Sequence, residues 1–287
     1  MSITEPRTTA RWRRSVLVVL AVGQLVSSGL ANLFGGAFTT SDRPGEPAIV
    51  PAGWAFSIWG LIMLLSLGWA VWADRAAPSD DPADDTVDRL VTPLLLVFAG
   101  FSAWIASAEV EPVWATVVVF VVMLAGLLVA CRVALARHDV VRTWSRTGRW
   151  LLWTLLGLYT GWSSVAIWLN LTTALVASGA PVTGAIGVAG QLGVLAAAVA
   201  TAATLVQRAR RVPGLALSGA AAVTWAFAGA TVGAAAAGEP LLALAAGIGT
   251  GLVAGLALAL LLGVREHAVP PTRTVPSAAP VEHGVTS

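Results

Sequence analysis

The sequence predicts an all-α integral membrane protein with eight transmembrane helices, and three observations lead to this fold class. The first is composition: of the 287 residues, 57% are hydrophobic and 11% are charged, whereas a soluble domain carries about 25% charged residues. Too few charged side chains remain to cover a water-exposed surface, so lipid must surround most of the folded chain. The other two observations are the length of the apolar runs and the placement of arginine.

Eight apolar runs are long enough to cross a bilayer, because a spanning helix needs about 20 residues at a rise of about 1.5 Å per residue. In chain order they cover residues 15–36, 54–73, 90–108, 113–136, 150–176, 187–206, 213–234 and 241–264. Residues 109–112 alone separate the third run from the fourth, and residues 207–212 alone separate the sixth from the seventh. Each run is therefore predicted to form one spanning helix, joined to its neighbour by a turn or a loop.

Arginine marks one side of the membrane. The chain has 17 arginines and no lysine, and with the N-terminus inside, every arginine except Arg43 falls in a cytoplasmic segment. Cytoplasmic loops carry an excess of positive charge, so both termini are predicted to be cytoplasmic. The first apolar run exceeds the core of about 7–15 residues in a signal peptide, which favours an uncleaved first span. A lysine-free composition rich in alanine and arginine is typical of a GC-rich bacterial genome and predicts the bacterial plasma membrane.

Composition divides the chain into four parts. They are a cytoplasmic N-terminus at residues 1–14, a five-helix bundle at 15–176, a three-helix extension at 177–264 and a cytoplasmic tail at 265–287. Twelve of the 13 tryptophans lie at or before Trp168, and only Trp225 lies in the extension. The tail is rich in proline and is predicted to be disordered. The acidic stretch at residues 80–88 is predicted to be a solvated cytoplasmic linker.

Glycines recur at helical spacing in the extension. Gly247, Gly251 and Gly255 form one small-xxx-small pattern, and Gly229 and Gly233 form another. A third set recurs every third residue, at positions 184, 187, 190 and 193. Small residues of this kind let helix backbones approach closely in lipid. We expect these faces to serve packing, within the chain or in a homo-oligomer.

The charged residues exclude several classes of function. No Asp, Glu, Lys, Arg or His lies in the middle of an apolar run, and such residues mark most proton relays and ion pathways in membranes. The usual acids, bases and metal ligands are missing there too, so no catalytic residue and no metal site is predicted, and an enzyme is disfavoured. The arginines lie in loops between spans, which is unlike a nucleic-acid-binding surface. The single cysteine, Cys131, excludes an internal disulfide.

Aromatic rings and amides gather in the predicted outer half of the first five spans. The alternating direction of the spans places there Asn32, Trp54, Phe56, Trp59, Trp104, Trp114, Trp168 and Asn170. A belt of aromatic residues at the membrane interface explains Trp114, but Trp59 and Trp104 lie deeper in their spans. Tryptophan offers a broad apolar face and one N–H donor. These residues therefore indicate a pocket for a planar aromatic ligand, although hydrogen bonds between helices would also explain the asparagines.

Two motifs carry a resemblance to a known family. Residues 51–59 (Pro-Ala-Gly-Trp-Ala-Phe-Ser-Ile-Trp) resemble the Pro-Pro-Gly-Trp-x-Phe-x-x-Trp signature that opens the second helix of the TspO/MBR family, the tryptophan-rich sensory or translocator proteins. Residues 161–170 are similar to the Trp-x-x-x-Ala-x-x-x-Asn stretch of that family's fifth helix. The likeness covers residues 15–176. The chain departs from the family at Ala52, which replaces the second proline, and at Phe101, which stands where an asparagine is expected.

The resemblance implies a divergent, extended member that binds a porphyrin, haem or a similar small planar hydrophobic molecule inside the five-helix bundle. The residues expected to form the site are Asn32, Pro51, Gly53, Trp54, Phe56, Trp59, Trp104, Trp168 and Asn170. Proline and glycine would shape the entrance, the rings would stack on the ligand and the asparagines would hydrogen-bond to it. Three alternatives stay open: a permease for a small or lipid-like solute, a protein that serves packing or assembly, and an enzyme that degrades tetrapyrroles by photochemistry at tryptophans.

Overall fold

The computed structural model describes residues 7–34, 45–75, 82–110 and 113–268 of the chain. These residues form helices and no strand, and eight of the helices are long and apolar enough to cross a membrane. The predicted fold class is therefore confirmed. Arg43, residues 35–36 of the first predicted span and residues 269–287 of the predicted disordered tail lie outside the described residues.

Each predicted apolar run overlaps one spanning helix over most of its length, although the first and third helices begin eight residues earlier than predicted. The spanning helices are α1 (Arg7–Phe34), α2 (Ile58–Arg75), α3 (Pro82–Val110), α4 (Val113–Ala136), α6 (Arg146–Ala177), α7 (Gly184–Ala209), α8 (Pro213–Ala236) and α9 (Pro240–Ala268). Two short helices complete the described part of the chain: the 3₁₀ helix η1 (Gly53–Ser57), which leads into α2, and α5 (His138–Thr143), which precedes α6.

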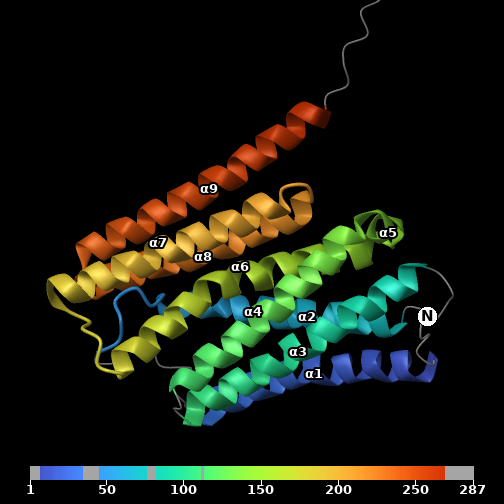
Figure 1. Ribbon diagram of the computed structural model, residues 1–287, viewed down its shortest axis with the longest axis horizontal. Helices are drawn as coiled ribbons and strands as arrows, with labels where there is room; N and C mark the ends of the chain where they lie inside the picture. Colours follow the sequence, from blue (N-terminus) through green and yellow to red (C-terminus); the bar gives the residue numbers. More distant parts are fainter. Residues whose placement is uncertain (1–6, 35–44, 76–81, 111–112, 269–287) are drawn as a thin grey trace, which may run out of the picture.

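The first five spanning helices form a ring, and the last three pack against one side of it (Figure 1). Around the ring, α1 contacts α2, α2 contacts α6, α6 contacts α4, α4 contacts α3, and α3 contacts α1. Helices α7, α8 and α9 pack on one another, and α7 and α8 also pack on α6. Helix α6 is therefore shared by both groups, and nearly every residue from Leu152 to Ala166 is buried. A helix that is apolar on all faces suits this central position.

Glycine permits the close packing of α6 against α8. A Cβ atom added at Gly161 would collide with the backbone of Gly219, and one added at Gly157 would collide with the side chain of Ser218. Helix backbones approach closely in lipid where such small residues face each other. Gly251, which belongs to one of the predicted glycine patterns, has no such neighbour, since no other atom lies within 4 Å of a Cβ added there.

The predicted acidic linker is helical from Pro82 onward and forms the first turns of α3. Its carboxylates pair with arginines: Asp85 with Arg89 at 2.8 Å and with Arg137 at 3.2 Å, and Asp88 with Arg14 at 2.7 Å. The prediction of a solvated loop was wrong for these residues because proline suits a first helical turn and carboxylates are stabilised near a helix N-terminus.

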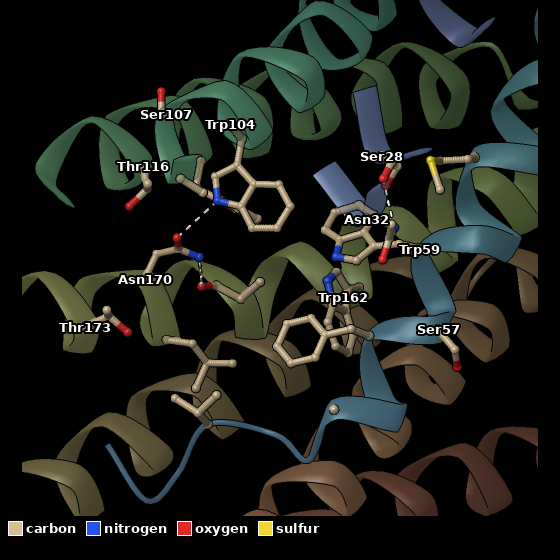
Figure 2. A pocket seen from close by; sticks show the side chains of 18 of the residues that line it. Ser28, Asn32, Ser57, Trp59, Trp104, Ser107, Thr116, Trp162, Asn170 and Thr173 are labelled. Carbon is tan, nitrogen blue, oxygen red and sulfur yellow. Dashed lines mark hydrogen bonds between the residues drawn. The ribbon is translucent and has the colours of Figure 1, made fainter. Parts of the chain in front are cut away.

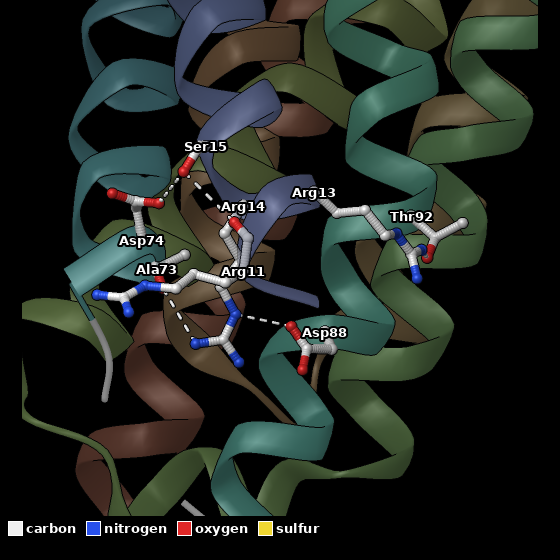
Figure 3. A network of polar contacts seen from close by, with 8 residues as sticks. All are labelled: Arg11, Arg13, Arg14, Ser15, Ala73, Asp74, Asp88 and Thr92. Carbon is white, nitrogen blue, oxygen red and sulfur yellow. Dashed lines mark hydrogen bonds and ion pairs between the residues drawn. The ribbon is translucent and has the colours of Figure 1, made fainter. Parts of the chain in front are cut away.

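A polar network at the arginine-rich end joins α1, α2 and α3 (Figure 3). Arg14 is 3% exposed, and its guanidinium donates to Asp88 on α3 and, at 3.5 Å, to the carbonyl oxygen of Ala73 on α2. Beside it, the Ser15 hydroxyl donates to Asp74 at 2.9 Å, and Arg13 donates to the hydroxyl of Thr92. The network therefore fixes the end of α1 against its two neighbours.

Candidate functional site

The turn before α2 is held by α8. Ala52 has polyproline-like backbone angles (φ −51°, ψ 145°), and η1 begins at the next residue. The Ala52 N–H donates to the Gly229 carbonyl oxygen at 3.0 Å, and Trp225 Nε1 donates to the Ala55 carbonyl oxygen at 2.8 Å. Helix α8 therefore positions the residues that lead into α2.

Two glycines of α8 make this approach possible. A Cβ added at Gly229 would lie 2.6 Å from the Cβ of Ala55 and 3.0 Å from the Cβ of Pro51. A Cβ added at Gly233 would collide with the carbonyl oxygen of Val50. This predicted glycine pair is a packing face, and its partner is the turn before α2.

A cavity of about 830 Å³ lies inside the five-helix ring and also reaches η1 (Figure 2). The rings that line it are those of Phe56, Trp59, Trp104, Phe120 and Trp162. Its uncharged polar lining consists of Ser28, Asn32, Ser57, Ser107, Thr116, Asn170 and Thr173, and Glu46 contributes a carboxyl group. Ligand pockets typically measure about 300–1,000 Å³ and combine an apolar wall with a few polar groups.

Trp59 is the centre of an aromatic cluster in the pocket wall. Its ring lies edge-on to Phe101 at 4.9 Å, Tyr159 at 5.6 Å and Trp162 at 6.0 Å, and tilted against Trp104 at 5.6 Å, measured between ring centroids. Aromatic pairs at these separations contribute about 0.5–1.5 kcal/mol each beyond their burial. The cluster therefore keeps Trp59, which is 2% exposed, in one orientation.

The two asparagines of the pocket bond within the protein. Asn170 accepts a hydrogen bond from Trp104 Nε1 at 3.2 Å and donates one to the carbonyl oxygen of Ala166 at 2.9 Å. Asn32 donates to the carbonyl oxygen of Ser28 at 2.8 Å. Each amide has further hydrogen-bonding capacity, since an asparagine side chain carries two N–H donors and an oxygen with two lone pairs.

Two indole N–H groups in the pocket wall have no acceptor. Among the buried side-chain atoms that lack a hydrogen-bond partner in the described part of the chain, only those of Trp59 and Trp162 belong to cavity-lining residues. The two indoles are neighbours in Figure 2. A buried donor without a partner costs about 1–3 kcal/mol. An acceptor that reached either group would remove this cost.

Six of the nine residues expected to form the site line the cavity: Asn32, Gly53, Phe56, Trp59, Trp104 and Asn170. The other three lie elsewhere. Pro51 packs against Gly229, and Trp54 is 45% exposed with its ring edge-on to Trp225 at 4.7 Å. Trp168 donates from Nε1 to the hydroxyl of Thr201 on α7 at 3.2 Å.

Helix geometry explains which tryptophans of α6 reach the cavity. With 3.6 residues per turn, positions four apart share a face, so Trp162, Ala166 and Asn170 all line the cavity. Trp168, two residues before Asn170, is on another face and meets α7. Trp162 was missing from the expected site, although it opens the second motif and its spacing from Asn170 gave the signal.

The site suits stacking and hydrogen-bond donation. Across the described residues, no three His, Cys, Asp or Glu side chains are grouped in a way that would hold a metal ion. What the cavity offers a ligand is aromatic faces, amides, hydroxyls and the carboxyl group of Glu46.

Comparison with known proteins identifies the family. A profile described as TSPO-like protein matches residues 14–259, which extends beyond the stretch covered by the two motifs and into α9. Neither the comparison with curated proteins nor that with solved structures found a match. The chain belongs to the TSPO-like family of membrane proteins.

Proposed function

We propose that this membrane protein binds a planar hydrophobic molecule of the porphyrin class in the cavity between α1, α2, α3, α4 and α6. The size and lining of the cavity support this proposal, since about 830 Å³ of space is bordered by five aromatic rings. Stacking on such rings favours flat, apolar molecules. The likeness to the TspO/MBR family supports the same class of ligand.

One observation carries the proposal: Trp59 and Trp162, two neighbours that line the cavity, carry buried indole N–H groups without acceptors. A porphyrin with carboxylate side chains, or any planar molecule with a carbonyl group, brings an acceptor to these donors. Binding then removes the cost of leaving two donors unsatisfied. A purely apolar ligand would gain only the stacking and the burial.

The test is a titration of the purified protein in detergent with protoporphyrin IX, followed by porphyrin fluorescence. The double variant Trp59→Phe, Trp162→Phe keeps aromatic rings in the wall and removes both donors. Each hydrogen bond contributes about 0.5–1.5 kcal/mol, so we expect an affinity about 5- to 150-fold weaker than that of the wild type.

Trp168→Phe is the matched control because Trp168 belongs to the same helix and donates away from the cavity to Thr201. We expect this variant to bind as the wild type does. Equal affinities for the double variant and the wild type would refute the role of the indole donors. Absence of saturable binding by the wild type would refute the proposal as a whole.

We also propose that the protein lies in a bacterial plasma membrane with both termini in the cytoplasm. The distribution of arginine supports this orientation. Cysteine labelling tests it, because replacing Cys131, the chain's single cysteine, leaves a background free of thiols. A cysteine at Ala180, between α6 and α7, should react with a membrane-impermeant maleimide in intact cells, whereas one at Thr143, before α6, should react only after lysis. The reverse labelling pattern would show that both termini lie outside the cytoplasm and would refute the proposed orientation.

A further inference from the structure

A second cavity, of about 370 Å³, lies outside the five-helix ring. It is lined by α4 on one side, α7 on the other and α6 between them, with a contribution from α8. Helices α4 and α7 each pack on α6, and within the described part of the chain no substantial contact joins α4 to α7. The space between them is therefore a groove along α6. Its base is made of the small residues Gly157, Thr160, Gly161 and Ser164.

The groove has the length of the hydrocarbon layer of one leaflet. Its lining on α4 runs from Ala125 to Leu135, and these 10 helical steps of about 1.5 Å each extend about 15 Å. The hydrocarbon core of a bilayer is about 30 Å thick, so the groove matches half of it. On α7 the lining runs from Ala202 to Ala209, the last residue of that helix. The groove therefore ends at the arginine-rich end of the bundle.

Two arginines line the end of the groove. Arg132 precedes the end of α4 by four residues, and Arg208 lies in the last turn of α7. Both are exposed, and neither guanidinium forms an ion pair with a carboxylate among the described residues. No Asp or Glu lines the groove. The groove thus combines an apolar wall with two positive charges at one end.

We propose that this groove binds one anionic phospholipid, with an acyl chain along α6 and the phosphate between Arg132 and Arg208. Basic pockets between transmembrane helices are suited to acidic lipid headgroups. Guanidinium groups bind phosphate oxygens through paired, charge-assisted hydrogen bonds. The positive charges of the two arginines select an anionic lipid, because an apolar groove without charge would accept any lipid. The site is separate from the porphyrin cavity, since the two lie on different faces of α6.

Native mass spectrometry of the full-length protein in detergent tests the role of charge. The protein is incubated with phosphatidylglycerol and phosphatidylcholine that carry identical acyl chains. Two arginines near a headgroup predict a preference for phosphatidylglycerol of roughly tenfold or more. We expect this preference to disappear in the double variant Arg132→Gln, Arg208→Gln. It should persist in Arg210→Gln, Arg211→Gln, which removes two neighbouring arginines that do not line the groove.

A steric variant tests the position of the acyl chain. Ala125 and Val121 are both exposed on α4, and only Ala125 lines the groove. We expect Ala125→Trp to reduce retention of phosphatidylglycerol several-fold and Val121→Trp to leave it unchanged. The proposal is overturned if the wild type retains both lipids equally, or if the two arginine double variants lose the preference alike. Displacement of phosphatidylglycerol by an equal concentration of oleate would also overturn it, because the groove would then be a fatty-acid site.

Discussion

Replacing Gly233 with alanine should displace the turn before α2. The added Cβ would collide with the carbonyl oxygen of Val50 and lie 3.3 Å from the amide nitrogen of Ala52. These atoms belong to the backbone and cannot rotate away, so the strain should equal that of an overpacked core, about 1–3 kcal/mol. Alanine gains about 0.5–1 kcal/mol over glycine inside a helix. The net expected loss of stability is therefore about 0.5–2 kcal/mol.

The same change at Gly251 is the matched control, because no other atom lies within 4 Å of a Cβ added there. Gly251→Ala should keep or slightly raise the thermal stability in detergent. A shift of the turn before α2 would relieve the strain at Gly233. A bound ligand would require the turn to return to its original place, so the cost of that return lowers the affinity. The protoporphyrin IX affinity should therefore fall by about 2- to 30-fold. Identical melting temperatures and affinities for the two variants would refute the reasoning that α8 supports the site.

Two further changes test named contacts. Trp225→Phe removes the 2.8 Å hydrogen bond to the Ala55 carbonyl oxygen, which still accepts a bond from a backbone N–H. The free energy of porphyrin binding should therefore weaken by no more than the net value of one hydrogen bond, about 0.5–1.5 kcal/mol. A larger loss in the titration would contradict this account. Arg14→Gln breaks the pair with Asp88, in which the arginine side chain is 4% and the aspartate side chain 29% exposed. Thermal denaturation should show a loss of about 1–3 kcal/mol, below the about 3–5 kcal/mol of a fully buried pair. Arg89→Gln, in an exposed pair, should cost about 0.3–0.5 kcal/mol, and equal losses for the two arginines would count against a structural role for the buried one.

The spanning helices could be predicted from the sequence because the length of an apolar run depends on neighbouring residues alone. The fourth run coincides with α4, Val113–Ala136. The helical start of α3 was harder to predict, since the residues after Pro82 are acidic and resemble a solvated loop until their partners Arg14 and Arg137 are known. Those partners lie 74 and 52 residues away in the sequence.

The candidate site could be predicted only in part because its members depend on helix phase and on distant packing. Trp59 and Trp104 follow from depth in the membrane, and Trp162 could have been found from its spacing to Asn170. Trp54 could not have been excluded in this way, because η1 is a 3₁₀ helix and follows a different period. The contact of the turn with Gly229 joins two regions that no local pattern connects.

The support that α8 gives to the turn has a consequence for biogenesis. The Ala55 carbonyl oxygen finds its indole partner 170 residues further along the chain, and the N–H of Ala52 finds its acceptor on the same late helix. Ribosomes deliver the N-terminal helices to the bilayer first. The first five spans therefore enter the membrane before the residues that hold the turn before α2 exist, and the turn gains its support only when α8, the seventh spanning helix, has been inserted. A nascent chain arrested after α6 would lack the helix that positions the turn before α2.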